Sequence, residues 1–155
     1  MYQDGYPLAI KEAKNRRLPL LDTGGSVATL GLSLMVYFNF DSYYLFGQDL
    51  GFSGEHTHAE YSTSGIDVKN NQILNKILAN NGEYIYSTPN LLTYHRWFER
   101  KISSYNIEIY NTAYSGARII GVSYIGENEL FEKFDNLKVC NLRNQLKKYM
   151  TPVSK

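Results

Sequence analysis

A glycine pair lies between a short apolar run and a long apolar segment, and this order leaves few possible folds. Leu18 to Leu21 is the short run, and Asp22-Thr23-Gly24-Gly25-Ser26 follows it. From Ser26 to about Phe38, apolar residues recur at helical spacing on more than one face, which predicts a buried helix. We expect Gly31, inside this helix, to permit close packing on a sheet. The segment therefore predicts a strand, a tight turn and a buried helix.

The chain then repeats this alternation. The aromatic run Ser42 to Phe46 predicts a strand, and Gly47-Gln48-Asp49-Leu50-Gly51 predicts a loop after it. Strands that alternate with helices are typical of an α/β domain with a mostly parallel sheet. We therefore assign the chain to the α/β class.

Further elements follow in the rest of the chain. Residues 51–72 are irregular and predict a functional loop or lid, because long insertions without structure are uncommon in compact domains. Residues 73–79 and 83–86 predict a hairpin around Asn80-Asn81-Gly82, with a helix over 72–79 as the alternative. The remaining predicted elements are a short helix within residues 1–17, a helix from Ser87-Thr88-Pro89 to about Ser103, a strand over 107–110, a turn over 115–117, an extended segment over 118–122, and helices over 127–134 and 137–150.

Composition excludes several classes of protein. The 155 residues carry a net charge of +1, which gives no basic field for a nucleic-acid partner. Cys140 is the single cysteine, so an internal disulfide framework is excluded, and we interpret it as a small apolar residue. No segment resembles a signal peptide, and the longest apolar stretch, about residues 27–40, is too short to span a bilayer. These features indicate a cytoplasmic globular protein.

Two loops offer groups that could bind a ligand. In Thr23-Gly24-Gly25-Ser26, backbone N–H groups at a helix N-terminus could approach an anion, although a plain tight turn is the alternative. Gly47-Gln48-Asp49 follows a predicted strand, at the end where open α/β sheets bind ligands. Asp49 could accept from a sugar hydroxyl, hold a metal, act as a base, or cap a turn.

Two later motifs carry further candidates. His56 and His58 would share a face in an extended chain, so they could hold zinc, contact a ligand, or lie in a solvated loop. Hydroxyl groups converge at Tyr86-Ser87-Thr88, where a strand meets a helix. This junction suits phosphate contacts, and simple helix capping is the alternative.

Several motifs together resemble one known family. The segments that carry the resemblance are Thr23-Gly24-Gly25-Ser26-Val27-Ala28, Tyr44-Leu45-Phe46-Gly47-Gln48-Asp49-Leu50-Gly51-Phe52, Gly54-Glu55-His56-Thr57-His58-Ala59, Tyr86-Ser87-Thr88-Pro89 with Arg96-Trp97-Phe98-Glu99, and Ile109-Tyr110-Asn111-Thr112 with Gly116-Ala117-Arg118-Ile119-Ile120-Gly121. Over about residues 18–135, their order resembles the central domain of the motility accessory factor proteins, which are bacterial flagellin glycosyltransferases. This MptE-like domain family includes archaeal enzymes similar to hydroxymethylpterin pyrophosphokinase, and it is similar to bacterial sialyltransferases of the modified Rossmann kind.

The resemblance implies a fold and a reaction. The fold would be a partial Rossmann-like, three-layer α/β/α domain of the sialyltransferase-like variant over residues 1–135, followed by a C-terminal helix or tail over 136–155. The enzyme would move a sialic-like nonulosonic acid, of the pseudaminic or legionaminic type, from a CMP-sugar to serine or threonine of flagellin. It would need no metal or other cofactor. Its partners would be the nucleotide-sugar, flagellin and other domains of a longer parent chain, with no nucleic acid and no membrane span.

The resemblance also implies site residues. The residues expected at the donor nucleotide are Thr23, Gly24, Gly25, Ser26, Gln48, Ser87 and Thr88. The expected catalytic residues are Asp49, which would line the donor site, Tyr86, which stands where the sialyltransferases place a catalytic histidine, and His58, our substitute candidate for the base. Family members carry an upstream strand with a Gly-Pro-Ser turn, and nothing before Leu18 resembles it. We therefore expect that the chain lacks this N-terminal strand-turn half, which could leave it inactive alone.

Two other functions stay open. One is a pyrophosphokinase that uses ATP and magnesium, with Asp49 near the metal. The other is a non-catalytic fragment that only binds flagellin or a partner subunit.

Overall fold

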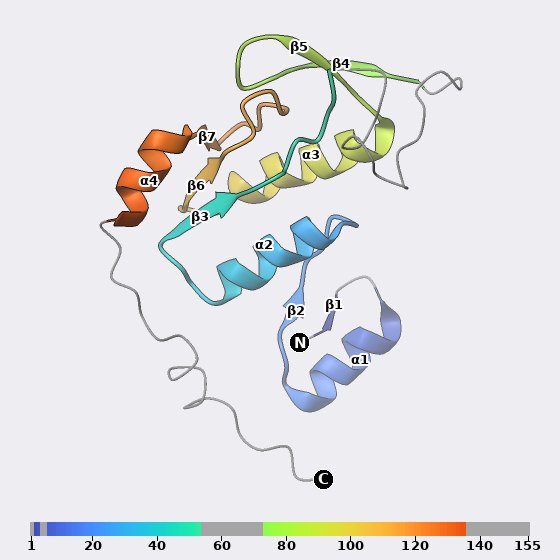
Figure 1. The fold of residues 1–155 in the computed structure, drawn as a ribbon. Coiled ribbons are helices and arrows are strands. Elements are labelled where there is room, and N and C mark those ends of the chain that lie inside the picture. The colour runs from blue at the N-terminus through green and yellow to red at the C-terminus, as the bar shows by residue number, and fades with distance from the viewer. Residues whose placement is uncertain (1, 4–5, 54–72, 136–155) are drawn as a thin grey trace, which may run out of the picture. The chain divides into compact units, whose positions relative to one another are not determined.

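A computed structural model describes residues 2–3, 6–53 and 73–135 of the chain (Figure 1). It divides into two compact units, Met1–Ile125 and Gly126–Lys155. Because residues 136–155 lie outside the described part, the domain division predicted at residue 135 stays a prediction. The predicted helix over 137–150 and Cys140 also lie outside it.

The first unit begins with a strand, a helix and a second strand. These are β1 (Tyr2–Gln3), α1 (Pro7–Arg16) and β2 (Leu20–Leu21), and β1 pairs with β2 in parallel. Pro7 opens the helix, where its fixed φ suits the first turn. The helix predicted within residues 1–17 and the strand predicted over 18–21 are both confirmed.

Helix α2 (Val27–Tyr37) follows the glycine pair and is capped by Ser26, so the helix predicted over 26–38 is confirmed. Its predicted burial on most sides is wrong. Only Thr29, Leu32 and Ser33 are buried, whereas Val27 is 88% exposed. The apolar residues run round the helix, but a single stripe of them reaches the core.

Gly31 corrects a second expectation about this helix. A Cβ added to it would meet no atom within 4 Å, leaving aside the helix's own neighbouring backbone. Gly31 therefore does not serve close packing on a sheet, because it lies where α2 has open space beside it.

A small parallel sheet joins three strands that are distant in the sequence. They are β3 (Ser42–Leu45), β6 (Glu108–Asn111) and β7 (Ser123–Tyr124), in the order β3-β6-β7. The predicted strands over 42–46 and 107–110 are confirmed, and the chain is a mixed α/β protein with a small parallel sheet.

The extended segment predicted over 118–122 is wrong. The chain turns there, with Gly121 at a φ of 88° and the Val122 N–H donating to the Ile119 carbonyl at 3.1 Å. Strand β7 starts only after this turn. Gly121 can adopt this left-handed conformation in a tight turn because glycine has no Cβ.

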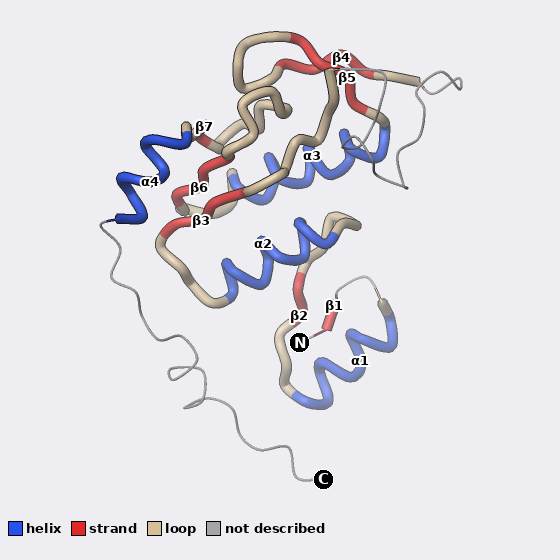
Figure 2. Tube along the Cα trace, in the orientation of Figure 1, coloured by secondary structure: helices blue, strands red, loops and turns tan. Residues whose placement is uncertain are grey.

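The predicted hairpin is confirmed and its helical alternative is wrong. Strands β4 (Asn75–Leu78) and β5 (Tyr84–Ser87) pair antiparallel, and Gly82 takes a φ of 86° in the turn between them. Figure 2 shows both strands close to the start of α3. Helix α3 (Pro89–Ile102) is capped by Thr88, as predicted.

One hydrophobic core lies within the first unit, in the part from α2 onward. Its buried residues come from α2, β3, β5, α3 and β6 and the loops between them, namely Leu32, Tyr43, Leu50, Ala79, Ile85, Trp97, Phe98, Ile102, Ile109, Ala117 and Ile119.

The described part of the second unit is helix α4 (Glu127–Asp135), which confirms the helix predicted over 127–134. None of the helices in the described ranges is long and apolar enough to cross a membrane.

Candidate functional site

The Thr23–Ser26 loop is organised around the hydroxyl of Thr29. Thr29 Oγ1 accepts from the N–H groups of Gly24 at 3.0 Å and Ser26 at 3.1 Å, and it donates to the Ser26 carbonyl at 2.7 Å. The Ser26 hydroxyl in turn accepts from the Thr29 N–H at 3.2 Å, which completes a capping box. Two of the N–H groups expected to bind an anion are therefore already used within the loop.

A different constraint requires glycine at each position of the pair. A Cβ on Gly24 would come within 2.5 Å of Trp97 Cγ and 2.8 Å of Thr29 Cγ2. Gly25 has a φ of 91°, which side chains other than glycine rarely adopt. The loop thus lies directly against the indole of α3.

Asp22 ties the start of this loop to the same helix. Its carboxylate forms an ion pair with Lys101 and accepts from Trp97 Nε1 at 3.4 Å. Burial opposes its ionisation, but hydrogen bonds from Lys101 and Trp97 and the charges of Lys101 and Arg100 outweigh that effect, so the pKa of Asp22 is lowered. The hydrogen bond to Asp22 is the main reason that the pKa of Lys101 is raised. Each partner thus keeps the other charged.

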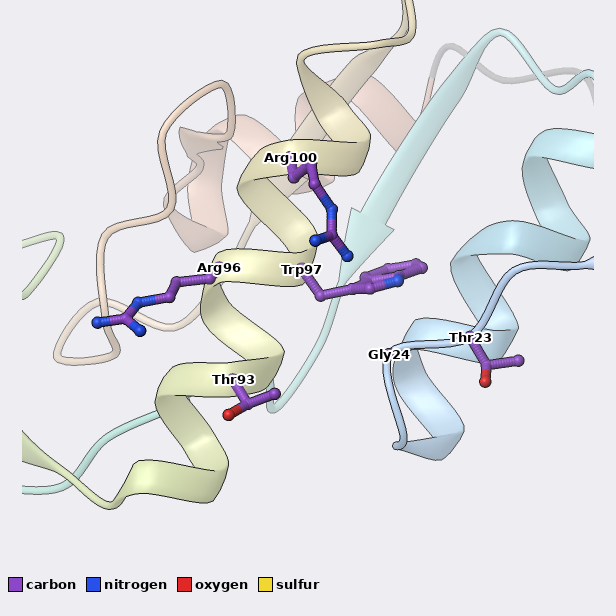
Figure 3. A pocket seen from close by; sticks show the side chains of 6 residues that line it. All are labelled: Thr23, Gly24, Thr93, Arg96, Trp97 and Arg100. Carbon is purple, nitrogen blue, oxygen red and sulfur yellow. The ribbon is translucent and has the colours of Figure 1, made fainter. Parts of the chain in front are cut away.

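A pocket of about 350 Å³ lies between this loop and α3. Its lining residues are Thr23, Gly24, Thr93, Arg96, Trp97 and Arg100. Thr93, Trp97 and Arg100 are spaced four and three positions apart, so they lie on one side of the helix, whereas Arg96 is adjacent to Trp97 in the sequence. In Figure 3, Trp97 extends from α3 toward the Thr23–Gly24 loop, Arg100 lies on the same side, and Arg96 extends away.

The second candidate loop, Gly47 to Leu50, is held by distant residues. The buried Asn111 side chain donates from Nδ2 to the Gln48 carbonyl at 3.2 Å and accepts from the Ala113 N–H at 3.1 Å. The Ala117 N–H donates to the Asp49 carbonyl at 2.7 Å. These contacts fix the loop at the carboxyl end of β3 and leave the Asp49 side chain exposed.

The Tyr86–Thr88 junction is used mainly for structure. The N–H and carbonyl of Tyr86 pair with Phe52, and its side chain is 46% exposed. Ser87 is fully buried, and its hydroxyl donates to the Leu50 carbonyl at 2.8 Å. Its side chain is therefore not exposed for the predicted contact with the donor nucleotide. Thr88 caps α3 by accepting from the Leu91 N–H.

The structure brings together part of the predicted site. Thr23 and Gly24 line the pocket, whereas the other described site candidates do not, namely Gly25, Ser26, Gln48, Asp49, Tyr86, Ser87 and Thr88. His58 lies outside the described residues, so its role stays a prediction. The described ranges contain no group of three or more histidine, cysteine or acidic side chains placed to hold a metal.

Sequence reasoning missed four residues that shape these loops. The sequence could have identified Arg100, because it lies three positions after Trp97 on one side of a predicted helix, and Arg96 lies four positions before Arg100. Thr29 could also have been identified from the sequence, because it lies three positions after a helix-capping serine. Asn111 is an ordinary polar residue at a strand end, and no local pattern distinguishes it.

Comparisons with known proteins add no relative: no family model, curated protein or solved structure matches the chain.

Proposed function

We propose that this chain is a cytoplasmic glycosyltransferase domain that transfers a nonulosonic acid from a CMP-sugar to serine or threonine of flagellin. One observation carries the proposal: Thr23 and Gly24, expected at the donor from the family resemblance, line a pocket with two arginines. The family's partial Rossmann-like, three-layer fold belongs to the same proposal, which the mixed α/β class and small parallel sheet support.

The pocket has properties that suit the phosphate end of a nucleotide. Its volume equals that of about twelve water molecules, so it can take a phosphate with an attached sugar ring. Guanidinium groups pair with phosphate oxygens in a fixed, two-pronged geometry. The Thr93 hydroxyl, which donates to the Pro89 carbonyl at 3.0 Å, can still accept a hydrogen bond beside the apolar face of Trp97.

Catalysis would need a base within hydrogen-bond reach of the acceptor hydroxyl. Asp49 and Tyr86 are the described candidates, since both side chains are exposed, and His58 is the third candidate. The bond from the sugar's anomeric carbon to the phosphate oxygen would break, with its electron pair leaving on the phosphate. The acceptor oxygen would bond to that carbon and give its proton to the base.

The single tryptophan of the chain makes donor binding directly measurable. Trp97 lines the pocket, so its fluorescence and its indole N–H resonance should change when CMP or CMP-sialic acid is added. Incubation with a CMP-nonulosonic acid and flagellin should then add one or more sugar masses to flagellin.

Three results would contradict this function. Absence of any CMP response at Trp97 would remove the donor site. A response only to ATP with magnesium would favour a pyrophosphokinase. Flagellin binding without CMP binding or sugar transfer would favour a non-catalytic fragment.

A further inference from the structure

We infer that Arg100 and Arg96 hold a phosphate group in the pocket beside Gly24, with Arg100 as the main contact. The inference rests on the proposed function for the identity of the nucleotide, but not for the phosphate itself. It names two phosphate-binding residues that the family resemblance does not assign.

The charge balance of α3 leaves these two side chains available. The second half of the helix carries three cations, Arg96, Arg100 and Lys101. It also carries one anion, Glu99, which accepts from the Ile120 N–H and lies 3.7 Å from His95 Nδ1. Asp22 takes up the charge of Lys101 in an ion pair. Within the described part of the chain, neither arginine forms an ion pair, although the charge of Arg100 contributes to the lowered pKa of Asp22. The charged side chains that line the pocket are these two guanidinium groups. A phosphate is the ligand that this arrangement favours.

The loop opposite α3 explains why the arginines are needed. A glycine-rich turn before a helix often binds phosphate through its backbone N–H groups. Here Thr29 already accepts from the Gly24 and Ser26 N–H groups. The loop therefore contributes surface contact and the partial positive charge of a helix N-terminus. Most hydrogen-bond donors to the phosphate must come from α3.

The two arginines have different starting positions. Arg100 lies on the side of α3 that faces Thr23 and Gly24, whereas Arg96 extends away from them (Figure 3). Both side chains are solvent-exposed and can rotate. We expect Arg100 to contact phosphate in its present orientation and Arg96 to turn inward when a ligand binds, so removal of Arg100 should weaken binding more.

The test measures affinity by Trp97 fluorescence for CMP, cytidine and inorganic pyrophosphate. The variants are Arg100→Gln, Arg96→Gln and Arg100→Lys, with Arg118→Gln as the control because Arg118 is exposed and outside the pocket. We expect Arg100→Gln to weaken CMP binding about tenfold or more, and Arg96→Gln to weaken it less. Arg100→Lys should fall between Arg100→Gln and wild type, and Arg118→Gln should match wild type. The affinity for cytidine, which lacks phosphate, should be the same in wild type and in every variant.

The outcomes separate this inference from the proposed function. Unchanged CMP affinity in Arg100→Gln and Arg96→Gln would overturn the phosphate site and leave the donor function standing. Arginine-dependent pyrophosphate binding without any CMP binding would support the phosphate site and overturn the function. If no probe binds wild type, both fail. Because both arginines are exposed, circular dichroism should show wild-type folding in every variant.

Discussion

The two candidate loops of this protein are built in opposite ways. The Thr23–Ser26 loop is closed by Thr29, three and five positions away from the N–H groups that it binds. The Gly47–Leu50 loop is closed by Asn111 and Ser87, 63 and 37 positions from the carbonyls that they bind. The hydrogen bonds that close the first loop are local, whereas those that close the second loop come from distant parts of the sequence.

This difference separates what each loop can tolerate. Local hydrogen bonds depend on a few neighbouring residues, so loss of one of them should alter that loop and little else. A loop held by buried side chains from other strands shares its stability with the core. The effects of substitutions at the two loops should therefore differ in how much stability is lost and in how far from the substitution the structure changes. Four substitutions test this difference.

The largest effect is expected for Asn111→Asp, which places a carboxyl group among the contacts that hold the second loop. A protonated carboxyl could still donate to the Gln48 carbonyl, but a buried carboxylate could not. Burial should raise the folded pKa of the new group above its unfolded value near 3.9. Relative to wild type, the variant should be nearly as stable at pH 4 and lose roughly 3 kcal/mol by pH 8.

Urea unfolding at several pH values would measure this, with exposed Asn106→Asp as the matched control. A loss independent of pH would show that the carboxyl group is not confined among these partners.

Gly24→Ala should give the next largest effect, at the local loop. The new methyl group would overlap Trp97 and Thr29, and overpacking of this kind costs about 1–3 kcal/mol. Gly31→Ala is the control in the same region, because its methyl group would enter open space. The control should raise stability by roughly 0.5–1 kcal/mol, as expected for alanine in place of glycine inside a helix. Equal losses in both variants would show that contact with Trp97 does not determine the cost.

Thr29→Val tests whether the hydroxyl closes the local loop. Valine keeps the shape of threonine but leaves the Gly24 and Ser26 N–H groups without their acceptor, which should cost about 1–2 kcal/mol. Amide exchange at Gly24 and Ser26 should become faster, while exchange at Asn111 and Ala113 stays near wild type. Thr29→Ser keeps the hydroxyl and should retain slow exchange. Faster exchange at both loops would break the distinction between them.

Asp22→Asn should have the smallest effect, since it removes the tie between the local loop and Lys101. The Asp22 side chain is 35% exposed, so solvent screening limits the loss to about 0.5–1 kcal/mol. The lowered pKa of Asp22 means that its contribution is present above about pH 4 and disappears as pH falls below its unfolded pKa. Wild type and variant should therefore converge in stability near pH 2 in a urea series. A gap that persists at pH 2 would assign the loss to packing.

The sequence predicted the local loop and most of the helices and strands for a shared reason. Capping at Ser26, the proline after Thr88 and the turn at Gly82 act over a few residues, so a single segment contains their evidence. The exposure of Val27 and the open space at Gly31 were missed, because the side of α2 that meets the core depends on distant strands. The pairing of Asn111 with Gln48 was equally hidden, since only the parallel sheet brings β3 and β6 together.

The capping box at Ser26 and Thr29 also bears on how the protein forms during synthesis. Its partners leave the ribosome almost together, so the turn can close while the strands that hold the second loop are still untranslated. The loop after β3 must wait for Asn111 and Ala117, which takes several seconds at about 5–20 residues per second. In that interval the nascent chain exposes Tyr43 and Leu50, which the finished fold buries. Slow translation between the synthesis of Leu50 and that of Asn111 and Ala117 would prolong the period in which these apolar side chains are exposed and a chaperone is most needed.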